Sequence, residues 1–321
     1  LPEYAIETVL AYTAGQSYKL NNFVFTNRVG YVSANVTGAN RLLAGLGWPL
    51  IMLINMLKNN QSLNIKNNNK LELLVLGIGA ISMIIASVIK FQPIFISFIL
   101  IIIYLIYLFI TSKKESTESE FIGTSEYLAN LPKLTRITTN ILLIIFSAVT
   151  IFIVSHPFVE SLIHIGGKFG IDEYYLIQWL APLASESPEI IIASLFAMKG
   201  RSLESISIIL SSQANQMSLL IGSMGAIFSF ATSSLISFPL NDTQGVEFLL
   251  TSAFALLQIS MILWGKFKLQ MPVLLLIIFF VQLIITDTSI RAYLSIAIYM
   301  FALIYLILFI TKNKIQPIKK Q

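Results

Sequence analysis

Long apolar runs, each bounded by a short polar stretch, recur along the whole chain. A helix needs about 20 apolar residues to cross the hydrocarbon core of a bilayer. Such runs are predicted near residues 1–14, 30–56, 71–89, 93–112, 138–165, 174–198, 205–229, 246–264, 271–285 and 292–310. The chain is 56% hydrophobic and 12% charged, whereas soluble domains carry about 25% charged residues. The pattern predicts an all-α, polytopic membrane protein of about ten transmembrane segments within the lipid bilayer.

A Pro-Glu pair occurs twice inside these runs, as Pro2-Glu3 and Pro188-Glu189. A carboxylate inside a membrane span costs about 2.5–3.5 kcal/mol on insertion scales, so it marks a functional site. A duplicated one indicates a transporter built from two repeats, with its site where the repeats meet. The two runs are five spans apart, an odd number, so they cross the membrane in opposite directions. The sequence therefore predicts an inverted-topology repeat.

The first run is shorter than the others. Residues 1–14 cover only about 21 Å as a helix, less than the ~30 Å hydrocarbon core. Glu189 lies past the middle of its own run, eleven residues before Gly200, and Glu3 lies twelve residues before Gly15. The comparison predicts that the sequence begins within a helix. On this interpretation the first repeat lacks its first helix and part of its second.

The basic residues fall mostly in alternate loops. With the 113–136 loop taken as cytoplasmic, the outer side holds only Lys19, Arg28, Lys90, Lys168 and Arg291, while Arg41 lies inside a span. The cytoplasmic side holds Lys58, Lys66, Lys70, Lys113, Lys114, Lys133, Arg136, Lys199, Arg201, Lys266, Lys268, Lys312, Lys314, Lys319 and Lys320. This positive-inside bias accounts for the net charge of +5 without a nucleic-acid partner, and it places the C-terminus in the cytoplasm.

The chain divides into two halves. Residues 1–112 form the first half, 113–136 a short cytoplasmic linker, 137–286 the second half, and 287–321 an extra helix with a basic tail. The chain has no cysteine, which excludes disulfides and thiolate metal sites. No covalently bound cofactor and no obligatory protein partner is expected.

Oxygen-bearing side chains surround the second Pro-Glu pair. Pro188 removes a backbone donor, so the helix is expected to break or kink there and to free carbonyl oxygens. Ser185, Glu186 and Glu189 add side-chain oxygens, and the two glutamates share one helix face. Clustered oxygens suit a hard cation such as Ca²⁺ or Na⁺.

The first half carries a similar set of polar residues. Glu3 and Glu7 are four residues apart and also share a helix face. The run that follows each Pro-Glu helix is polar as well: it contains Asn35, Thr37, Asn40 and Arg41 in the first half, and Ser211, Ser212, Gln213, Asn215 and Gln216 in the second. Small and amide residues can also hold helices together, so a purely structural role stays open for Asn35, Ser211 and Ser212.

These motifs resemble those of the sodium/calcium exchanger (cation/Ca²⁺ antiporter) superfamily, prokaryotic type. Its members carry two inverted repeats, each with a G-T-S-x-P-E type helix followed by a helix with G-S-N-x-x-[N/D]. The resemblance implies that acid, amide and hydroxyl side chains line the ion sites. It also implies an integral protein of a prokaryotic inner or plasma membrane, with segment 138–165 moving as a gate.

The family pattern is carried over position by position. Glu3 and Glu189 match the motif glutamates, Ser185 matches the Thr, and Glu186 falls on the Ser, which adds a charge. The implied cation ligands are Glu3, Glu189, Ser185, Glu186, Thr37, Asn40, Ser212, Asn215 and Gln216. The G-S-N-x-x-[N/D] pattern can be aligned with the first half in two registers. One register places Arg41 at a ligand position. The other aligns residues 38–40 with G-S-N and keeps Asn40 as ligand.

Arg41 departs most from the pattern, because a guanidinium has no acceptor and cannot ligate a metal. Glu7 is an extra acid relative to the pattern. The hypothesis is that Arg41 pairs with Glu7 inside the site and takes the place of one monovalent ion. The alternative is that Arg41 forms a structural pair and lies off the ion path.

The function predicted from these features is secondary antiport, in which Ca²⁺ or a similar cation exchanges against Na⁺ by alternating access. Exchange coupled to H⁺ is the alternative, and a cation channel is a further one. An enzyme is not expected, because no nucleophile–base pair or cofactor motif is present. His156, Glu160 and His164 share a helix face and form a second potential metal or proton site.

Overall fold

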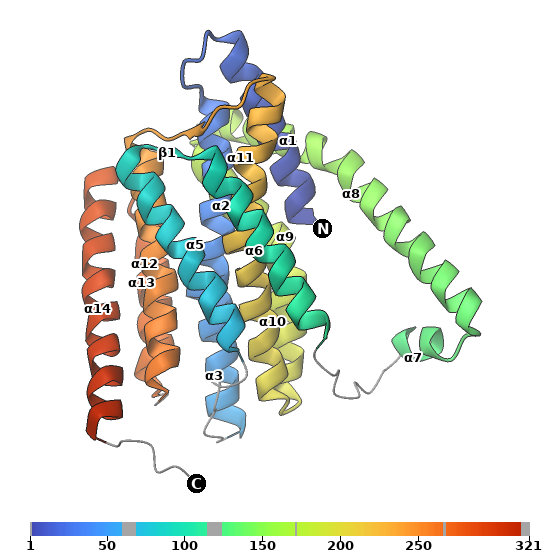
Figure 1. Ribbon diagram of the computed structural model, residues 1–321, viewed down its shortest axis with the longest axis vertical. Helices are drawn as coiled ribbons and strands as arrows, with labels where there is room; N and C mark the ends of the chain where they lie inside the picture. Colours follow the sequence, from blue (N-terminus) through green and yellow to red (C-terminus); the bar gives the residue numbers. More distant parts are fainter. Residues whose placement is uncertain (1, 60–68, 114–123, 171, 266–267, 316–321) are drawn as a thin grey trace.

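A computed structural model describes residues 2–59, 69–113, 124–170, 172–265 and 268–315. It is a helical bundle whose long axes run roughly side by side (Figure 1). The first half comprises α1 (Pro2–Leu20), α2 (Asn27–Leu42), η1 (Leu43–Gly47), α3 (Trp48–Asn59), α5 (Lys70–Ile89), β1 (Phe91–Gln92) and α6 (Ile94–Ser112). The remainder comprises α7 (Thr124–Ala129), α8 (Lys133–Phe169), α9 (Glu173–Met198), α10 (Ser202–Asn215), η2 (Gln216–Leu220), α11 (Ile221–Thr232), β2 (Phe238–Pro239), α12 (Asp242–Trp264), α13 (Gln270–Ile284) and α14 (Thr288–Ile315).

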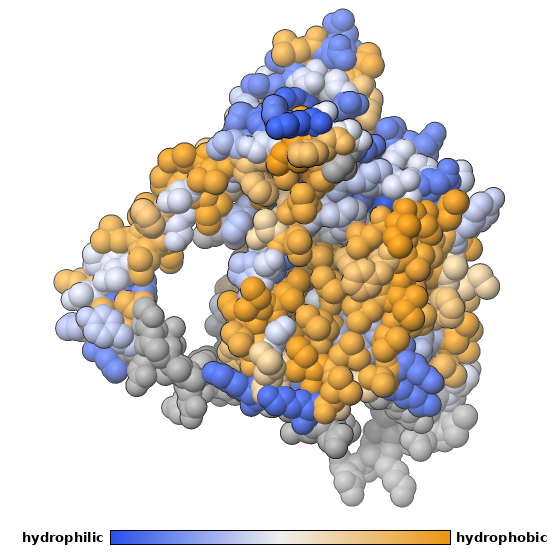
Figure 2. All heavy atoms as spheres, turned by 180° about the vertical axis from the view of Figure 1, so that it is seen from behind, coloured by the Kyte–Doolittle hydropathy of each residue, from blue (hydrophilic) through white to orange (hydrophobic). Residues whose placement is uncertain are grey.

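Besides the short α7, the described residues form ten helical rods at the places of the ten predicted spans, and two of these rods are built from three consecutive pieces. Seven helices within the described residues are long and apolar enough to cross a membrane, and α13 is a shorter apolar helix. Hydrophobic residues cover much of the bundle's flank, and hydrophilic residues gather toward its ends (Figure 2). This distribution is that of a polytopic all-α membrane protein, as predicted from the sequence.

Each half contains a π-helix at a matching place. The rod α2–η1–α3 widens at Leu43–Gly47, and the rod α10–η2–α11 widens at Gln216–Leu220. Short π segments inserted in α-helices are rare and occur frequently at functional sites. Both lie at the end of the polar stretches that the sequence predicted to line the ion path: η1 begins two residues after Arg41, and η2 begins at Gln216.

The helix α8 stands apart from the bundle along much of its length (Figure 1). Its most apolar stretch is exposed, including Leu142, Ile144 and Phe146. Only its later part packs on α1 and α9, through Val159 and Leu162. An exposed face of this composition is suited to contact with lipid.

The loops between α5 and α6 and between α11 and α12 are joined by a two-residue antiparallel ladder. Phe91 pairs with Pro239 and Gln92 with Phe238. Lys90 adds an ion pair to Asp242, with 2.9 Å between Nζ and Oδ1. The two halves of the chain are therefore tied together at this end of the bundle.

Three expectations from the sequence need correction. The helix α9 continues through Pro188 from Glu173 to Met198, so a break there is wrong, while a kink, the other form expected, stays a prediction. Arg291, taken as an outer-loop charge, is buried in α14. The helix α1 extends to Leu20, beyond the predicted end at residue 14.

The domain division made from the sequence stays a prediction. Part of the proposed linker, residues 114–123, and most of the basic tail, residues 316–321, lie outside the described residues. Within the linker the structure describes the short helix α7.

Candidate cation site

Three glutamates from the two halves of the chain gather inside the bundle. Glu3 on α1 and Glu186 on α9 are buried, and Glu189, one helical turn after Glu186, is half-buried. The carboxyl groups of Glu186 and Glu3 are close enough to share a hydrogen bond when one of them holds a proton, and Glu189 lies within electrostatic range of both. The innermost pair is thus Glu3 with Glu186, whereas the sequence favoured Glu3 with Glu189.

A hydrogen-bonded link joins this pair to the partner helix of the second half. The amide Nδ2 of Asn215, on α10, donates to Oε1 of Glu3 at 3.1 Å. The Tyr4 hydroxyl donates to Oδ1 of the same amide. Asn215 is therefore held in one orientation, with its donor group directed at the carboxylate.

Several buried polar atoms on α9, α10 and η2 have no hydrogen-bond partner within the described ranges. They include both carboxyl oxygens of Glu186, Oε2 of Glu189, and both side-chain polar atoms of Gln213 and of Gln216. None of the three glutamates forms an ion pair with a Lys or Arg side chain in the part of the chain that the structure describes. Buried acceptors of this kind are expensive unless a donor or a cation satisfies them. The chemistry of the set therefore fits a proton or a hard cation as substrate.

The described residues do not form a closed metal centre. No three His, Asp or Glu side chains among them are grouped closely enough to hold a metal ion. His156 and His164 are exposed on α8, and Glu160 between them pairs with Arg28, with 3.0 Å between Nη1 and Oε1. Nothing in this geometry supports the second potential metal site.

The other predicted ligands differ in their placement. Ser185 is buried beside Glu186 and borders a small, mainly apolar pocket of about 260 Å³ shared with α1 and α8. Ser212 is half-buried on α10, and Gln216 begins η2. Asn40 is buried on α2, where its Nδ2 donates to the Val36 carbonyl at 2.9 Å and its Oδ1 has no partner.

The π-helices favour one of the two registers left open for the first half. Leu43 and Gln216 begin equivalent π-helices. When these two residues are aligned, Gly38 in the first half falls opposite Ser211 in the second. This spacing aligns residues 38–40 with the G-S-N pattern. Asn40 then occupies the polar motif position, and Arg41 does not occupy a ligand position.

Arg41 belongs to a separate buried cluster. Its guanidinium pairs with Glu247 on α12, and Nη1 also donates to Oε1 of Gln282 on α13 at 2.7 Å. Arg291 on α14 pairs with the same glutamate. The expected pair between Arg41 and Glu7 is therefore wrong, because the acid that meets Arg41 comes from the opposite half of the chain.

Further hydrogen bonds connect the side chains of this group, which we call the arginine cluster (Arg41, Arg291, Glu247, Gln178, Gln282 and Thr37), and Nε2 of Gln282 is its one buried atom without a partner among the described residues. Gln178 donates to Oε2 of Glu247 at 2.8 Å and to the Thr37 hydroxyl at 3.2 Å. Nε of Arg291 donates to the Ile285 carbonyl at 2.7 Å. Thr37 thus contacts the arginine cluster, in contrast to its predicted place among the cation ligands.

Several of these residues carried no signal in the sequence. Tyr4 resembles any aromatic residue of a span, and Gln178, Glu247 and Gln282 are isolated polar residues in other apolar runs. Their contacts with Arg41, Thr37 or Asn215 span at least 141 residues of sequence. An intramembrane glutamate such as Glu247 is a functional-site candidate by itself, and that was the one available clue.

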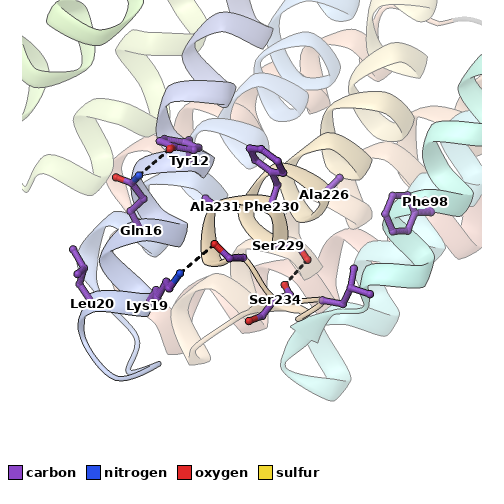
Figure 3. Close-up of a pocket in the computed structure, with 12 residues that line it drawn as sticks. Tyr12, Gln16, Lys19, Leu20, Phe98, Ala226, Ser229, Phe230, Ala231 and Ser234 are labelled. Atoms are coloured by element: carbon purple, nitrogen blue, oxygen red, sulfur yellow. Dashed lines mark hydrogen bonds between the residues drawn. The ribbon is translucent and has the colours of Figure 1, made fainter.

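A pocket with a volume of about 930 Å³ lies elsewhere among the described residues. It opens between the end of α1 and the end of α11, where Lys19 donates to the Ser233 hydroxyl at 3.1 Å (Figure 3). Its lining includes Tyr12, Gln16 and Phe230 but none of the three glutamates. The carboxylate site is therefore a buried one and does not lie in this pocket.

Comparison with known proteins agrees with the geometry. The family described as "Sodium/calcium exchanger protein" matches residues 2–113 and 139–311. The solved structure of the H⁺/Ca²⁺ exchanger CAX is similar, with a TM-score of 0.90, 32% sequence identity, and coverage of 98% of this chain and 79% of that one. The structure of native YfkE shares the fold at 15% identity, with a TM-score of 0.61 and coverage of 93% and 81%. Comparison with curated protein sequences gives no match. Because the family match covers both halves of the chain, this protein belongs to the sodium/calcium exchanger family of cation antiporters.

Proposed function

We propose that the protein exchanges Ca²⁺ for protons across the membrane, at a site formed by Glu3, Glu186 and Glu189. The observation that carries this proposal is the buried Glu3–Glu186 pair, in which two acids from opposite halves face each other without a basic side chain between them. Two carboxylates in contact cannot both remain ionised at low cost. They need a shared proton or a cation.

The exchange follows from this electrostatic constraint. A Ca²⁺ ion neutralises two carboxylates, and two protons achieve the same neutralisation without it. A site that holds neither carries unpaired buried charge, which is expensive to move between the two faces of the membrane. The site therefore changes its access from one membrane face to the other when Ca²⁺ or protons neutralise its carboxylates, and not when it is empty. Each movement of Ca²⁺ in one direction is thus coupled to a movement of protons in the other, and Ca²⁺ does not leak across alone.

Two observations favour protons over the Na⁺ that the sequence first favoured. Glu186 stands where the family pattern has a Ser, so this chain places a second titratable group beside Glu3. The similar protein of 32% identity is an H⁺/Ca²⁺ exchanger. A neutral hydroxyl at position 186 would serve as a Na⁺ ligand, whereas a carboxyl there can also bind and release a proton.

Transport by the protein in liposomes tests this function. We expect an outward proton gradient to drive Ca²⁺ uptake, and a Na⁺ gradient at constant pH to leave it at background. Glu186→Gln keeps the size of the side chain but removes the titratable group, and it should abolish proton-driven uptake. Uptake driven by Na⁺ alone would overturn the choice of counter-ion. Ca²⁺ flux without any counter-ion gradient, with selectivity changed by Glu189→Gln, would indicate a channel.

A further inference from the structure

One fully buried acid takes no part in the mechanism above. Glu7 lies one turn after Glu3 on α1 and has no exposed surface. Asn35 on α2 donates from Nδ2 to Oε2 of Glu7 at 2.9 Å, and Oε1 has no hydrogen-bond partner. Neither fixed protonation state suits this surrounding, because an ionised Oε1 lacks a donor and a protonated Oε1 lacks an acceptor.

The charged groups on the surrounding helices are engaged elsewhere. On α2, Arg28 pairs with Glu160 of α8, and Arg41 pairs with Glu247. On α9, Glu186 and Glu189 face Glu3, and Glu173 accepts a hydrogen bond from the Tyr31 hydroxyl. The sequence of α11 contains no charged residue, and His156 of α8 is exposed. Among the described residues, Glu7 therefore has no fixed counter-charge.

The second half has no equivalent of this acid. Alignment of the two Pro-Glu pairs places Glu7 opposite Ala193, which is buried and apolar. A residue that only supported the shared repeat architecture would be expected in both halves. Its presence in one half alone points to a role in which the two halves differ.

We propose that Glu7 and Asn35 form a second counter-cation site, which binds one monovalent cation per transport cycle in addition to those carried at Glu3 and Glu186. Under the function proposed above, on which this inference rests, the cation is a proton on Oε1 of Glu7. Asn35 is a positioning residue that keeps the other oxygen occupied as an acceptor. The charge moved per cycle then depends on Glu7.

The coupling ratio tests this site directly. In liposomes, the Ca²⁺ and proton gradients at which net Ca²⁺ flux is zero give the number of counter-ions per Ca²⁺. Glu7→Gln keeps the volume and the bond from Asn35, and we expect it to lower this ratio by one while equilibrium Ca²⁺ binding changes less than twofold. Glu72→Gln is the matched control: Glu72 is another buried acid, contacted by the Tyr107 hydroxyl at 3.4 Å, and its variant should keep the wild-type ratio. An unchanged ratio in Glu7→Gln overturns the site.

This outcome is separable from failure of the proposed function. If the gradients at which net Ca²⁺ flux is zero depend on Na⁺ and not on pH in the wild-type protein, the proton mechanism is wrong. The Glu7 site then still requires that Glu7→Gln lower the number of Na⁺ ions exchanged per Ca²⁺ by one. Infrared difference spectra of the purified protein between acid and alkaline pH give a readout without transport. The carbonyl stretch of a protonated carboxyl should disappear in Glu7→Gln and shift in Asn35→Leu. A spectrum identical to wild type in Glu7→Gln overturns the proposal.

Discussion

Single side chains orient the carboxylate pair. The Tyr4 hydroxyl holds Asn215, and Asn215 in turn donates to Glu3. Both contacts join α1 to α10 across more than 200 residues of sequence. The orientation of the Asn215 amide toward Glu3 thus depends on Tyr4, the residue that follows Glu3.

Tyr4→Phe should therefore weaken Ca²⁺ binding. Loss of one such hydrogen bond removes about 1 kcal/mol, which corresponds to roughly fivefold weaker affinity. Equilibrium binding of radioactive Ca²⁺ to the purified protein measures this change. Tyr12→Phe is the control, because Tyr12 lies on the same helix, is exposed, and bonds only to Gln16 among the contacts described for it. Equal affinities in the two variants would contradict the role of Tyr4.

For single residues, the sequence indicated which side chains belong to the site, but it did not indicate which side chains they contact. Glu3, Glu186 and Asn215 were all singled out by their chemistry inside apolar runs. The partner of Arg41 was assigned wrongly: Glu7 was chosen as an extra acid relative to the family pattern, whereas the acid that pairs with Arg41 is Glu247, 206 residues away. A buried guanidinium requires an acid, but sequence spacing does not indicate which acid.

Helix packing also depends on close approaches that only glycine permits. The helices α2 and α9 cross at Gly38, where an added Cβ would lie 1.8 Å from the Gln178 carbonyl oxygen. Because that atom belongs to the backbone, it cannot move aside without a shift of the whole helix. The approach brings Gln178 into contact with Thr37 and Glu247.

Gly38→Ala should consequently destabilise the protein strongly and lower its yield of folded material. Gly77→Ala is the matched control, since an added Cβ there meets nothing within 4 Å. Alanine is the better helix former by about 1 kcal/mol, so this control should be neutral or stabilising. Thermal denaturation in detergent distinguishes the two. A Gly38→Ala protein as stable as wild type would show that the helices separate at little cost.

The arginine cluster holds α2, α9, α12, α13 and α14 together through one acid and two bases. Removal of Glu247 leaves two buried guanidinium groups without a counter-charge. Removal of Arg41 instead leaves Glu247 with Arg291, a balanced pair. The effects of the two changes should therefore be unequal.

Glu247→Gln should lower the free energy of unfolding by about 3–5 kcal/mol, the cost of breaking a buried ion pair. Arg41→Gln should have the smaller effect. Denaturation midpoints of the two variants, measured side by side, provide the comparison. A larger loss in Arg41→Gln would show that Arg291 does not balance Glu247.

For the molecule as a whole, the order of the spans was predictable from the apolar runs, while their direction, which rests on loop charge, stays a prediction. The apolar runs predicted the ten rods because a bilayer demands a minimum length of apolar helix. The two π-helices were not predicted, since a single extra residue in a helical turn leaves no mark on hydrophobic periodicity. The position of α8 away from the bundle was also not predictable, because an apolar helix looks the same whether lipid or protein covers it.

The predicted orientation can be tested with single cysteines, because the chain has none of its own. Lys133→Cys and Ser234→Cys place exposed thiols at opposite ends of the bundle. With the linker in the cytoplasm, a membrane-impermeant maleimide should label Ser234→Cys in intact cells and Lys133→Cys only after lysis. The reverse pattern would invert the proposed topology.

The short ladder between Phe91–Gln92 and Phe238–Pro239 restricts how such a molecule can move. Backbone pairing holds the α5–α6 and α11–α12 loops together, so these four helices cannot separate at that end without breaking the ladder. A disulfide cross-link engineered between the two loops should therefore leave ion exchange unchanged. The same cross-link between those helices at their opposite ends should stop ion exchange.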